Sequence, residues 1–387
     1  MPPLDFPNSP ATGATYTGPN GVIWQYDGAK WISGTSANVY APIASPAFSG
    51  NPTAPTPPPG DADTSLATTQ FVSDAVATSL HDVGRNYIHN SMFNIQQRGN
   101  PGFIATGYTL DRWKLLLNLD AGSVAAGPFS DAQRAQIGDE EAVNALIVGV
   151  TGNAGSAAYT FLYQPVENVR RLANKTVTIS LWAYVTTGTA KLGIQLRQDF
   201  GTGGSPSAAV DVNGTAVTLS TTPTRYSVTI TLPSLAGKTL GTNNDSYVRF
   251  GFWFSAGASN NTVSGGIGVQ SNTFVLWGVQ LELGTVATPL EKRDPADELR
   301  VCQRFYQASN TWTAGWAGGA ISVGYRTEFP VRMRGTPIAV PADSGSVNIN
   351  VGTITSSADN RGIIIYGTAT AAGPVFLATS YTASADL

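Results

Sequence analysis

The sequence is poor in charge and in cysteine. Charged residues make up only 12% of its 387 residues, about half the share of about 25% that is usual for soluble proteins. The 22 lysines and arginines are outnumbered by 25 aspartates and glutamates, so no basic surplus is available to neutralise a phosphate backbone, and we expect no nucleic-acid partner. The single cysteine, Cys302, rules out an intramolecular disulfide framework. Stability must therefore come from burial and from contacts between subunits.

Long apolar runs are also missing. No segment approaches the roughly 20 consecutive apolar residues that cross a bilayer. The first residues, MPPLDFPNSP, have neither the basic nor the apolar part of a secretory signal. We therefore expect synthesis in the cytoplasm and no membrane insertion. Glycine and proline are abundant, with 42 and 24 residues, which suits turn-rich β structure.

Motifs for catalysis and metal binding are absent from the sequence. The two histidines, His81 and His89, show neither the spacing of a zinc protease nor that of a catalytic triad. The GKT at 237–239 is not a phosphate-binding loop, because Leu232 stands where the first glycine is required. We predict that the chain is not an enzyme and needs no cofactor or metal. A structural calcium ion stays open, with no ligands assigned.

Prolines divide the N-terminal part of the chain. Residues 1–38 are predicted to form a β-hairpin module, because an alternating VIWQY precedes an Asp27-Gly28 turn. Residues 39–85 follow as a proline-rich spacer and a short helix.

The helix expected after the spacer has Thr68 or Thr69 as its N-cap and Gly84 as its C-cap. It is too short to be stable without packing partners. A parallel trimer of such helices would supply them, and docking on the chain's own sandwich would do so equally well. The residues of this trimerisation helix are Phe71, Val72, Val76 and Leu80.

The rest of the chain has the period-2 alternation of strands. Residues 86–300 are predicted to form a β-sandwich or jelly roll, and residues 301–387 a smaller C-terminal β domain, so the fold class is all-β. That the sandwich is a jelly roll of the carbohydrate-binding type is implied by the resemblance described below. The stretch at 294–307 between them is predicted to be a helix or a bent strand. Trp312 and Trp316 belong either to a glycine-rich recognition loop or to the core of the smaller domain. The clearest strands are at 176–185, 190–198, 225–232, 247–254 and 274–283.

Strand parity selects a candidate ligand-binding face. In 176–185 the odd positions are apolar, so the even positions point away from the core. The same argument applies to 190–198 and 247–254. If these strands share one sheet, its outer face carries aromatic rings for stacking on sugars and polar groups for their hydroxyls. The alternative is that the rings are buried at a trimer interface or under a loop. The candidate glycan-binding residues are Trp182, Tyr184, Gln195, Arg197, Arg249 and Trp253.

Three segments resemble parts of bacteriophage proteins. The spacer APIASPAFSGNPTAPTPPPGDADTSLATTQFVSDAV is similar to segments of trimeric tail fibres, although it occurs here once and not in tandem. The segments NYIHNSMFNIQQRGNPGFIATGYTLDRWKL and VLWGVQLELGTVATPLEKRDPADELRVCQRFYQ resemble the two ends of a phage jelly-roll domain that has been likened to carbohydrate-binding modules. The hairpin module at 1–38, with FPNSPATGATYTGPNGVIWQYDGAKW, also looks like one found on phage structural proteins, which implies that it docks on the virion.

The resemblance implies a structural tail fibre or spike subunit that attaches the virion to the host surface. Its location would be the virion tail, after synthesis in the host cytoplasm. The implied partners are further copies of the chain in a homotrimer, other tail or baseplate proteins, and a host surface polysaccharide. Two alternatives stay open: a purely structural head-fibre, collar or decoration protein, and a capsule depolymerase.

Overall fold

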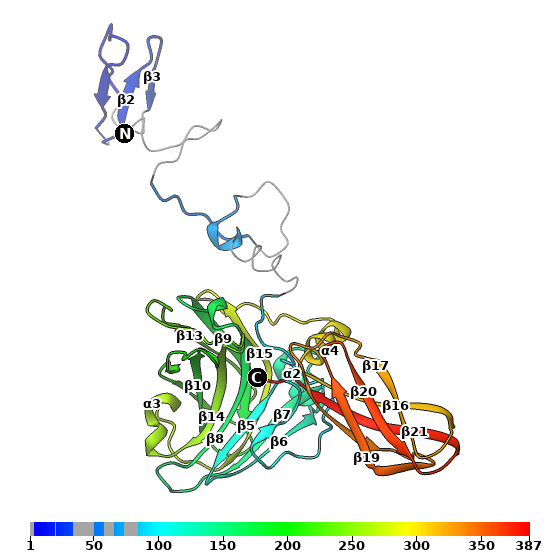
Figure 1. The fold of residues 1–387 in the computed structure, drawn as a ribbon. Helices are drawn as coiled ribbons and strands as arrows, with labels where there is room; N and C mark the ends of the chain where they lie inside the picture. The colour runs from blue at the N-terminus through cyan, green and yellow to red at the C-terminus, as the bar shows by residue number, and fades with distance from the viewer. Residues whose placement is uncertain (1–3, 20, 34–49, 58–65, 73–83) are drawn as a thin grey trace. The chain divides into compact units, whose positions relative to one another are not determined.

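A computed structural model of the chain is shown in Figure 1. Its contacts divide it into two compact units, Met1–Val76 and Ala77–Leu387, which are treated separately below. The structure describes residues 4–19, 21–33, 50–57, 66–72 and 84–387.

The first unit contains a small three-stranded sheet in the order β1-β2-β3. Its strands are β1 (Thr15–Thr17), β2 (Ile23–Tyr26) and β3 (Trp31–Ser33). The predicted hairpin is confirmed, because β2 pairs with β3 and the Asp27 carboxylate accepts hydrogen bonds from the backbone N–H groups of Ala29 and Lys30. The ring of Phe6 packs on Trp31, with their centroids 5.2 Å apart. This aromatic packing gives a short sheet a core of its own.

Residues 69–72 of the same unit are helical. The hydroxyl of Thr68 accepts a hydrogen bond from the backbone N–H of Phe71 at 3.1 Å, so Thr68 is the N-cap. Val76, Leu80 and His81 lie outside the described residues. Trimerisation through this helix therefore stays a prediction.

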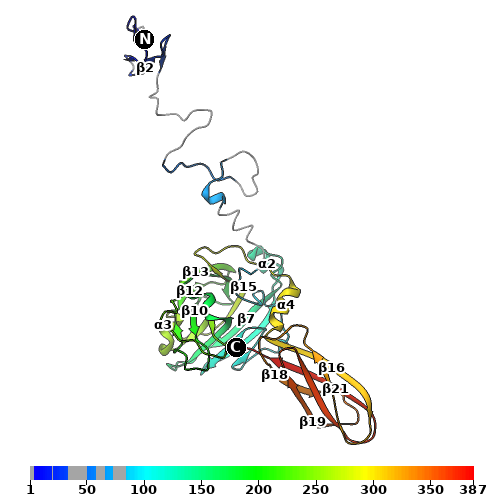
Figure 2. The same ribbon diagram turned by 45° about the horizontal axis from the view of Figure 1, so that its top comes forward.

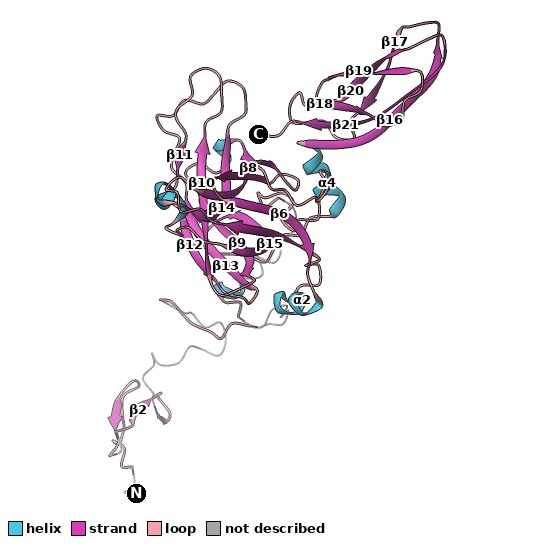
Figure 3. Cartoon of the chain, turned by 90° about the horizontal axis from the view of Figure 1, so that it is seen from below, coloured by secondary structure: helices cyan, strands magenta, loops and turns pink. Residues whose placement is uncertain are grey.

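The second unit begins with a sandwich of two antiparallel sheets (Figure 3). One sheet has five strands, in the order β13 (Thr224–Thr231), β9 (Thr176–Val185), β15 (Asn272–Leu283), β7 (Asn144–Thr151) and β6 (Ala121–Pro128). The other has seven, in the order β11 (Val210–Asp211), β10 (Ala190–Asp199), β14 (Tyr247–Ala256), β8 (Tyr159–Glu167), β5 (Lys114–Asn118) and β4 (Gly107–Tyr108), with β12 (Thr215–Leu219) also paired to β10.

This strand order is that of a jelly roll. The row β7-β15-β9-β13 faces the row β8-β14-β10-β12, and from β7 to β10, and again from β13 to β15, each strand lies in the sheet opposite to the one before it. The predicted all-β jelly roll is thereby confirmed. The core between the sheets contains the odd positions of β9, as the parity argument predicted, and the ring of Trp113 stacked on Phe252.

Short helices connect the strands. They are α2 (Asp131–Ile137), α3 (Asn261–Ser264) and α4 (Pro295–Gln303), together with the 3₁₀ turns η1 (Val169–Arg171) and η2 (Ala258–Asn260). Of the two structures considered for the stretch at 294–307, the helix is therefore the one formed over most of it.

A smaller domain of two three-stranded sheets ends the chain (Figure 2). One sheet has the order β16 (Tyr306–Ala317), β21 (Gly373–Ser384) and β18 (Ile338–Asp343). The other has the order β17 (Ser322–Glu328), β20 (Gly362–Ala369) and β19 (Ile349–Ala358). Its buried core includes Ile363, Ile365 and Tyr381.

The guanidinium group of Arg112 joins the jelly roll to this smaller domain. It is fully buried and donates a hydrogen bond to the carbonyl oxygen of Pro165 in β8 at 2.6 Å. Its central carbon lies 3.3 Å from the ring centroid of Phe305, which follows α4. A second arginine, Arg98, pairs with Asp386 near the end of β21. The two domains therefore share a buried polar contact.

A second buried polar network joins the first and last segments of the jelly roll. The carboxylate of Glu291 accepts hydrogen bonds from the backbone N–H groups of Gly84 at 2.8 Å and Asn86 at 2.5 Å, and it pairs with Arg293 at 3.3 Å. The side-chain oxygen of Gln280 in β15 accepts from the backbone N–H of Glu291 at 2.7 Å. These residues of the closing segment thus hold the opening segment in place.

Replacing Glu291 with alanine tests this closure. The change would leave the buried N–H of Asn86 and the partly buried N–H of Gly84 without their acceptor, while Arg293 would keep Glu298 as a carboxylate partner. Leaving a buried donor unsatisfied costs about 1–3 kcal/mol. We expect a loss of that size in the free energy of unfolding, measured by urea denaturation. The control is Glu140→Ala, whose carboxylate is 91% exposed and should change stability by less than about 0.5 kcal/mol. Equal effects of the two variants would contradict the assignment.

Candidate functional site

The jelly roll separates the six candidate glycan-binding residues into two groups. Trp182 and Tyr184 lie on β9 in the five-stranded sheet, whereas the other four lie on β10 and β14 in the seven-stranded sheet. The premise that these strands share one sheet is therefore wrong. The physical reason is the crossover of the jelly roll, which sends the consecutive strands β9 and β10 to opposite sheets.

Trp182 and Tyr184 point away from the core, as predicted, but the segment around α2 covers them. Tyr184 is buried in an apolar cluster with Trp277 and with Ile137 of α2, and Trp182 packs against the same cluster. The side-chain amide of Gln133 donates a hydrogen bond to the Tyr184 hydroxyl at 2.5 Å. The helix was missed in the sequence, although Ser130 and Gln133 form the capping box that marks its start.

The remaining four residues, together with Asp211, form one cluster of hydrogen bonds and ion pairs on the outer face of the seven-stranded sheet. The indole N–H of Trp253 donates to the Gln195 side-chain oxygen at 2.9 Å, and the Gln195 amide donates to the Asp211 carboxylate at 2.9 Å. The guanidinium groups of Arg249 and Arg197 lie 3.5 and 3.7 Å from the same carboxylate. Cross-strand pairing explains the grouping, since Arg197 stands opposite both Arg249 and Asp211. Sequence parity missed Asp211, whose two-residue strand carries no alternation.

Only part of this cluster is open to solvent. The side chains of Arg197 and Asp211 are 33% and 37% exposed, whereas Trp253 is 5% exposed. The connection at 257–271 covers Trp253, with Ile267 packed in the same apolar cluster. The Trp253 ring therefore cannot stack on a sugar. It is buried under a loop, which was one of the alternatives predicted for these rings. Its indole instead orients Gln195.

The electrostatics of the cluster favour hydrogen bonding over proton transfer. Burial lowers the pKa of Arg249, and the neighbouring charge of Arg197 lowers it further, while Asp211 opposes both effects. Burial also raises the pKa of Tyr163, on the adjacent strand β8, to about 12. Burial and the nearby Asp199 carboxylate raise the pKa of Tyr247. The face thus presents the guanidinium groups of Arg197 and Arg249, the Asp211 carboxylate and the uncharged hydroxyl of Tyr247, whereas Tyr163 is buried.

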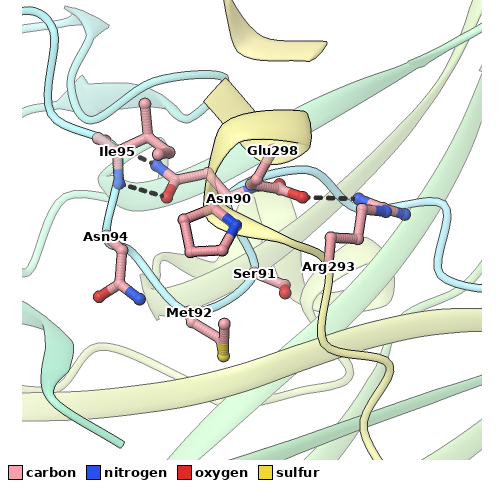
Figure 4. A pocket seen from close by; sticks show the side chains of 8 residues that line it. Asn90, Ser91, Met92, Asn94, Ile95, Arg293 and Glu298 are labelled. Atoms are coloured by element: carbon pink, nitrogen blue, oxygen red, sulfur yellow. Dashed lines mark hydrogen bonds and ion pairs between the residues drawn. The ribbon is translucent and has the colours of Figure 1, made fainter. Parts of the chain in front are cut away.

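A pocket between the opening segment and α4 is too small for a sugar (Figure 4). It holds a space of about 30 Å³, against about 300–1,000 Å³ for ligand pockets. Its polar groups are already paired, since Asn90 bonds to the backbone of Ile95, and Glu298 to Arg293 at 3.1 Å. This pocket is therefore a small gap in the packing and not a candidate ligand site.

The other chemically distinctive residues are partly or wholly shielded from solvent. His89 is half-buried, and burial together with nearby arginines lowers its pKa well below its usual value, so the ring is neutral. Cys302 is buried, and its pKa is raised well above its usual value, so it is a thiol and not a thiolate. Within the described parts of the chain, no group of three or more His, Cys, Asp or Glu side chains is placed to hold a metal ion.

Trp312 and Trp316 occupy neither of the positions predicted for them. They lie on strand β16 and not in a loop, and they are 65% and 74% exposed and so not part of the core. The glycine-rich stretch that contains them pairs with β21 without a break.

Among the described helices, none is long and apolar enough to span a membrane.

No protein-family model and no curated protein matches the chain. Solved structures match about half of it. The enzymatically active domain of tailspike protein 4 of bacteriophage CBA120 is 13% identical, with a TM-score of 0.32, over 52% of this chain and only 22% of that chain. The CBM22-1 xylan-binding domain of Xyn10C from Paenibacillus barcinonensis is 12% identical, with a TM-score of 0.29, over 53% of this chain and 99% of that chain. The C-terminal family 22 carbohydrate-binding module of Xyn10B from Clostridium thermocellum is 13% identical, with a TM-score of 0.30, over 53% of this chain and 99% of that chain. At these scores the similarity carries no argument about the ligand of this chain.

The raised pKa of Tyr163 predicts a pH dependence of stability. The folded chain holds the phenol proton up to about pH 12, whereas the unfolded chain releases it near pH 10. The stabilisation is therefore complete below pH 10 and is lost as pH rises toward 12. We expect the free energy of unfolding, from urea titrations, to fall less steeply over this interval in Tyr163→Phe than in the wild type. A Tyr366→Phe control removes an exposed hydroxyl and should keep the wild-type slope; the same slope in Tyr163→Phe would refute the prediction.

Proposed function

We propose that the chain is a structural subunit of a bacteriophage tail fibre or spike and that its jelly roll binds a glycan on the host surface. The observation that carries glycan binding is the cluster of Arg197, Arg249 and Asp211 on the open face of the seven-stranded sheet. The three segments that resemble phage fibre and jelly-roll sequences support the place in the virion. In this proposal the chain is not an enzyme.

The chemistry of the cluster suits sugar hydroxyls. A hydroxyl is both a donor and an acceptor, so it can donate to the Asp211 carboxylate while it accepts from a guanidinium group. Arg197 and Asp211 have exposed surface left for these bonds. Tyr247 adds a partly exposed ring and an uncharged hydroxyl beside them. Because neighbouring strands in register hold these groups, little side-chain freedom would be lost on binding.

The assembly proposed for the chain follows from the sequence. The N-terminal sheet would dock on another tail or baseplate protein, and the spacer and helix would set the register of a homotrimer. The docking sheet belongs to the first unit of the chain, and the glycan site belongs to the second.

A purely structural role in the virion is the second candidate. The observation that favours it is the burial of the predicted stacking rings, since Tyr184 and Trp253 are enclosed by segments of the same chain. A sandwich of this kind can pack against other virion proteins in a head fibre, collar or decoration protein without binding any sugar.

A glycan array followed by titration of the strongest hit separates the two candidates. In the glycan-binding case Arg197→Ala and Asp211→Ala each remove a charged hydrogen-bonding group, which is worth about 1.5–3 kcal/mol, and so weaken affinity about 10- to 100-fold. The matched control is Lys191→Ala, which removes an exposed charge from the same strand β10 outside the cluster. It should bind as the wild type does.

Two results would reject the glycan site. One is a blank array for folded wild-type protein. The other is unchanged affinity in both Arg197→Ala and Asp211→Ala, with folding verified by circular dichroism. Either result would leave the structural role as the better account of the sandwich.

A further inference from the structure

One outer face of the C-terminal domain is apolar, exposed and free of charge. It is the side of the sheet β16-β21-β18 that points away from the domain core, and it is called the β16 face below. Trp312, Trp316 and Ile338 on it are 65%, 74% and 77% exposed. Strand alternation and cross-strand pairing assign to it Ala308, Asn310, Trp312, Ala314 and Trp316 of β16, Pro374, Phe376, Ala378, Ser380 and Thr382 of β21, and Ile338, Val340 and Ala342 of β18.

The other sheet of the same domain has an ordinary outer face. There Arg326 pairs with Glu328 at 2.6 Å and with Asp359 at 3.2 Å, and all three side chains are exposed. Soluble monomers rarely expose a contiguous apolar patch of more than a few hundred Å². The contrast between the two sheets therefore marks the β16 face as a contact surface.

The size of the β16 face fits a specific contact. Three strands spaced about 4.8 Å apart, over about ten residues at about 3.3 Å each, give a flat area of about 470 Å². Covering it with an equal face buries about 1,000 Å² in total, which is about the minimum for a biological interface and less than the roughly 1,200–2,000 Å² of a standard one. A face of this size can hold two molecules together.

The β16 face is also complementary to itself in shape. Its Trp316 end is bulky, with the rings of Trp312 and Phe376 in contact, their centroids 5.6 Å apart. Its opposite end is hollow, with a depression of about 390 Å³ lined by residues that include Ala308, Ala342 and Ser380. Trp316 and Ala308 lie about 26 Å apart along β16 at about 3.3 Å per residue. A twofold axis in the plane of the contact, perpendicular to the strands, would place the bulky end of each copy on the hollow of the other.

We propose that a second copy of this chain packs on the β16 face in this antiparallel arrangement. A copy of the chain fits better than a sugar, because the tryptophan end offers few polar side chains to pair with hydroxyls that would be desolvated there. It also fits better than a charged partner, because the face has no charge to offer one. The contact is separate from the trimerisation expected of the helix near Phe71 and from the glycan site.

Light scattering on the full chain is the first test. The wild type should have at least twice the mass of one chain, and Trp312→Ser combined with Trp316→Ser should halve it, because apolar area is lost from both partners. The matched control is Tyr366→Ser, which removes an exposed ring from the outer face of β20. It should leave the mass unchanged. A monomeric wild type, or a double variant of unchanged mass, would overturn the proposal.

Cross-linking is the second test and does not rely on the tryptophan variant being folded. Asn310 and Ala314 lie on either side of Trp312, so in the antiparallel arrangement position 310 of one copy faces position 314 of the other. A short bifunctional thiol reagent should link two chains that carry both Asn310→Cys and Ala314→Cys, and it should link neither single variant. The native Cys302 is buried and does not interfere. Equal linking of the single variants would show a parallel contact, and no linking in the double variant would show that no copy sits there; both results overturn the proposal.

Discussion

The buried guanidinium group of Arg112 is the interaction on which the arrangement of the second unit depends. It bonds to β8 of the jelly roll and lies against Phe305, at the start of the smaller domain. The residue has a left-handed backbone, with φ of +72°, a conformation that few residues other than glycine adopt. Burial lowers the pKa of Arg112, while nearby acidic groups such as Asp386 act against that effect. A buried charge of this kind is tolerated only where its partners are fixed, so it specifies one way of joining the two domains.

The segments that resemble phage jelly rolls owe their polar residues to the fold. In the opening segment Asp111 accepts hydrogen bonds from Gln97, and Arg112 bridges the domains. In the closing segment Gln280 and Glu291 join the two ends of the jelly roll. Each of these residues is engaged within the chain. A resemblance based on them therefore identifies how the sandwich is closed and does not identify a ligand.

Much of the fold could be predicted from the sequence, because alternation is a local property of a strand. The five clearest strands and the inward side of β9 were predicted correctly. The sheet to which each strand belongs could not be predicted. The alternation of apolar and polar residues along β10 is the same whether β10 pairs with β9 or lies in the opposite sheet. The cover over Trp253 depends on the distant segment at 257–271, whose packing no local pattern reveals. The stretch around Trp312 was predicted as loop or core because it is rich in glycine. Its strand was not recognised, since Thr311 and Thr313 stand on the inward side, where alternation would have shown apolar residues.

The same lack of charge that marks the sequence has different consequences in the two domains. In the jelly roll, the charges near the candidate site are concentrated in one cluster of Arg197, Arg249 and Asp211, which is what a site for hydroxyls requires. In the smaller domain, the charged pairs of Arg326 lie on one sheet and the β16 face has none. Because desolvating a charge is costly, a face without charges can be covered by its own copy at low cost. The two proposals, ligand binding and self-association, thus concern different domains of the chain, so a substitution that tests one can leave the other intact.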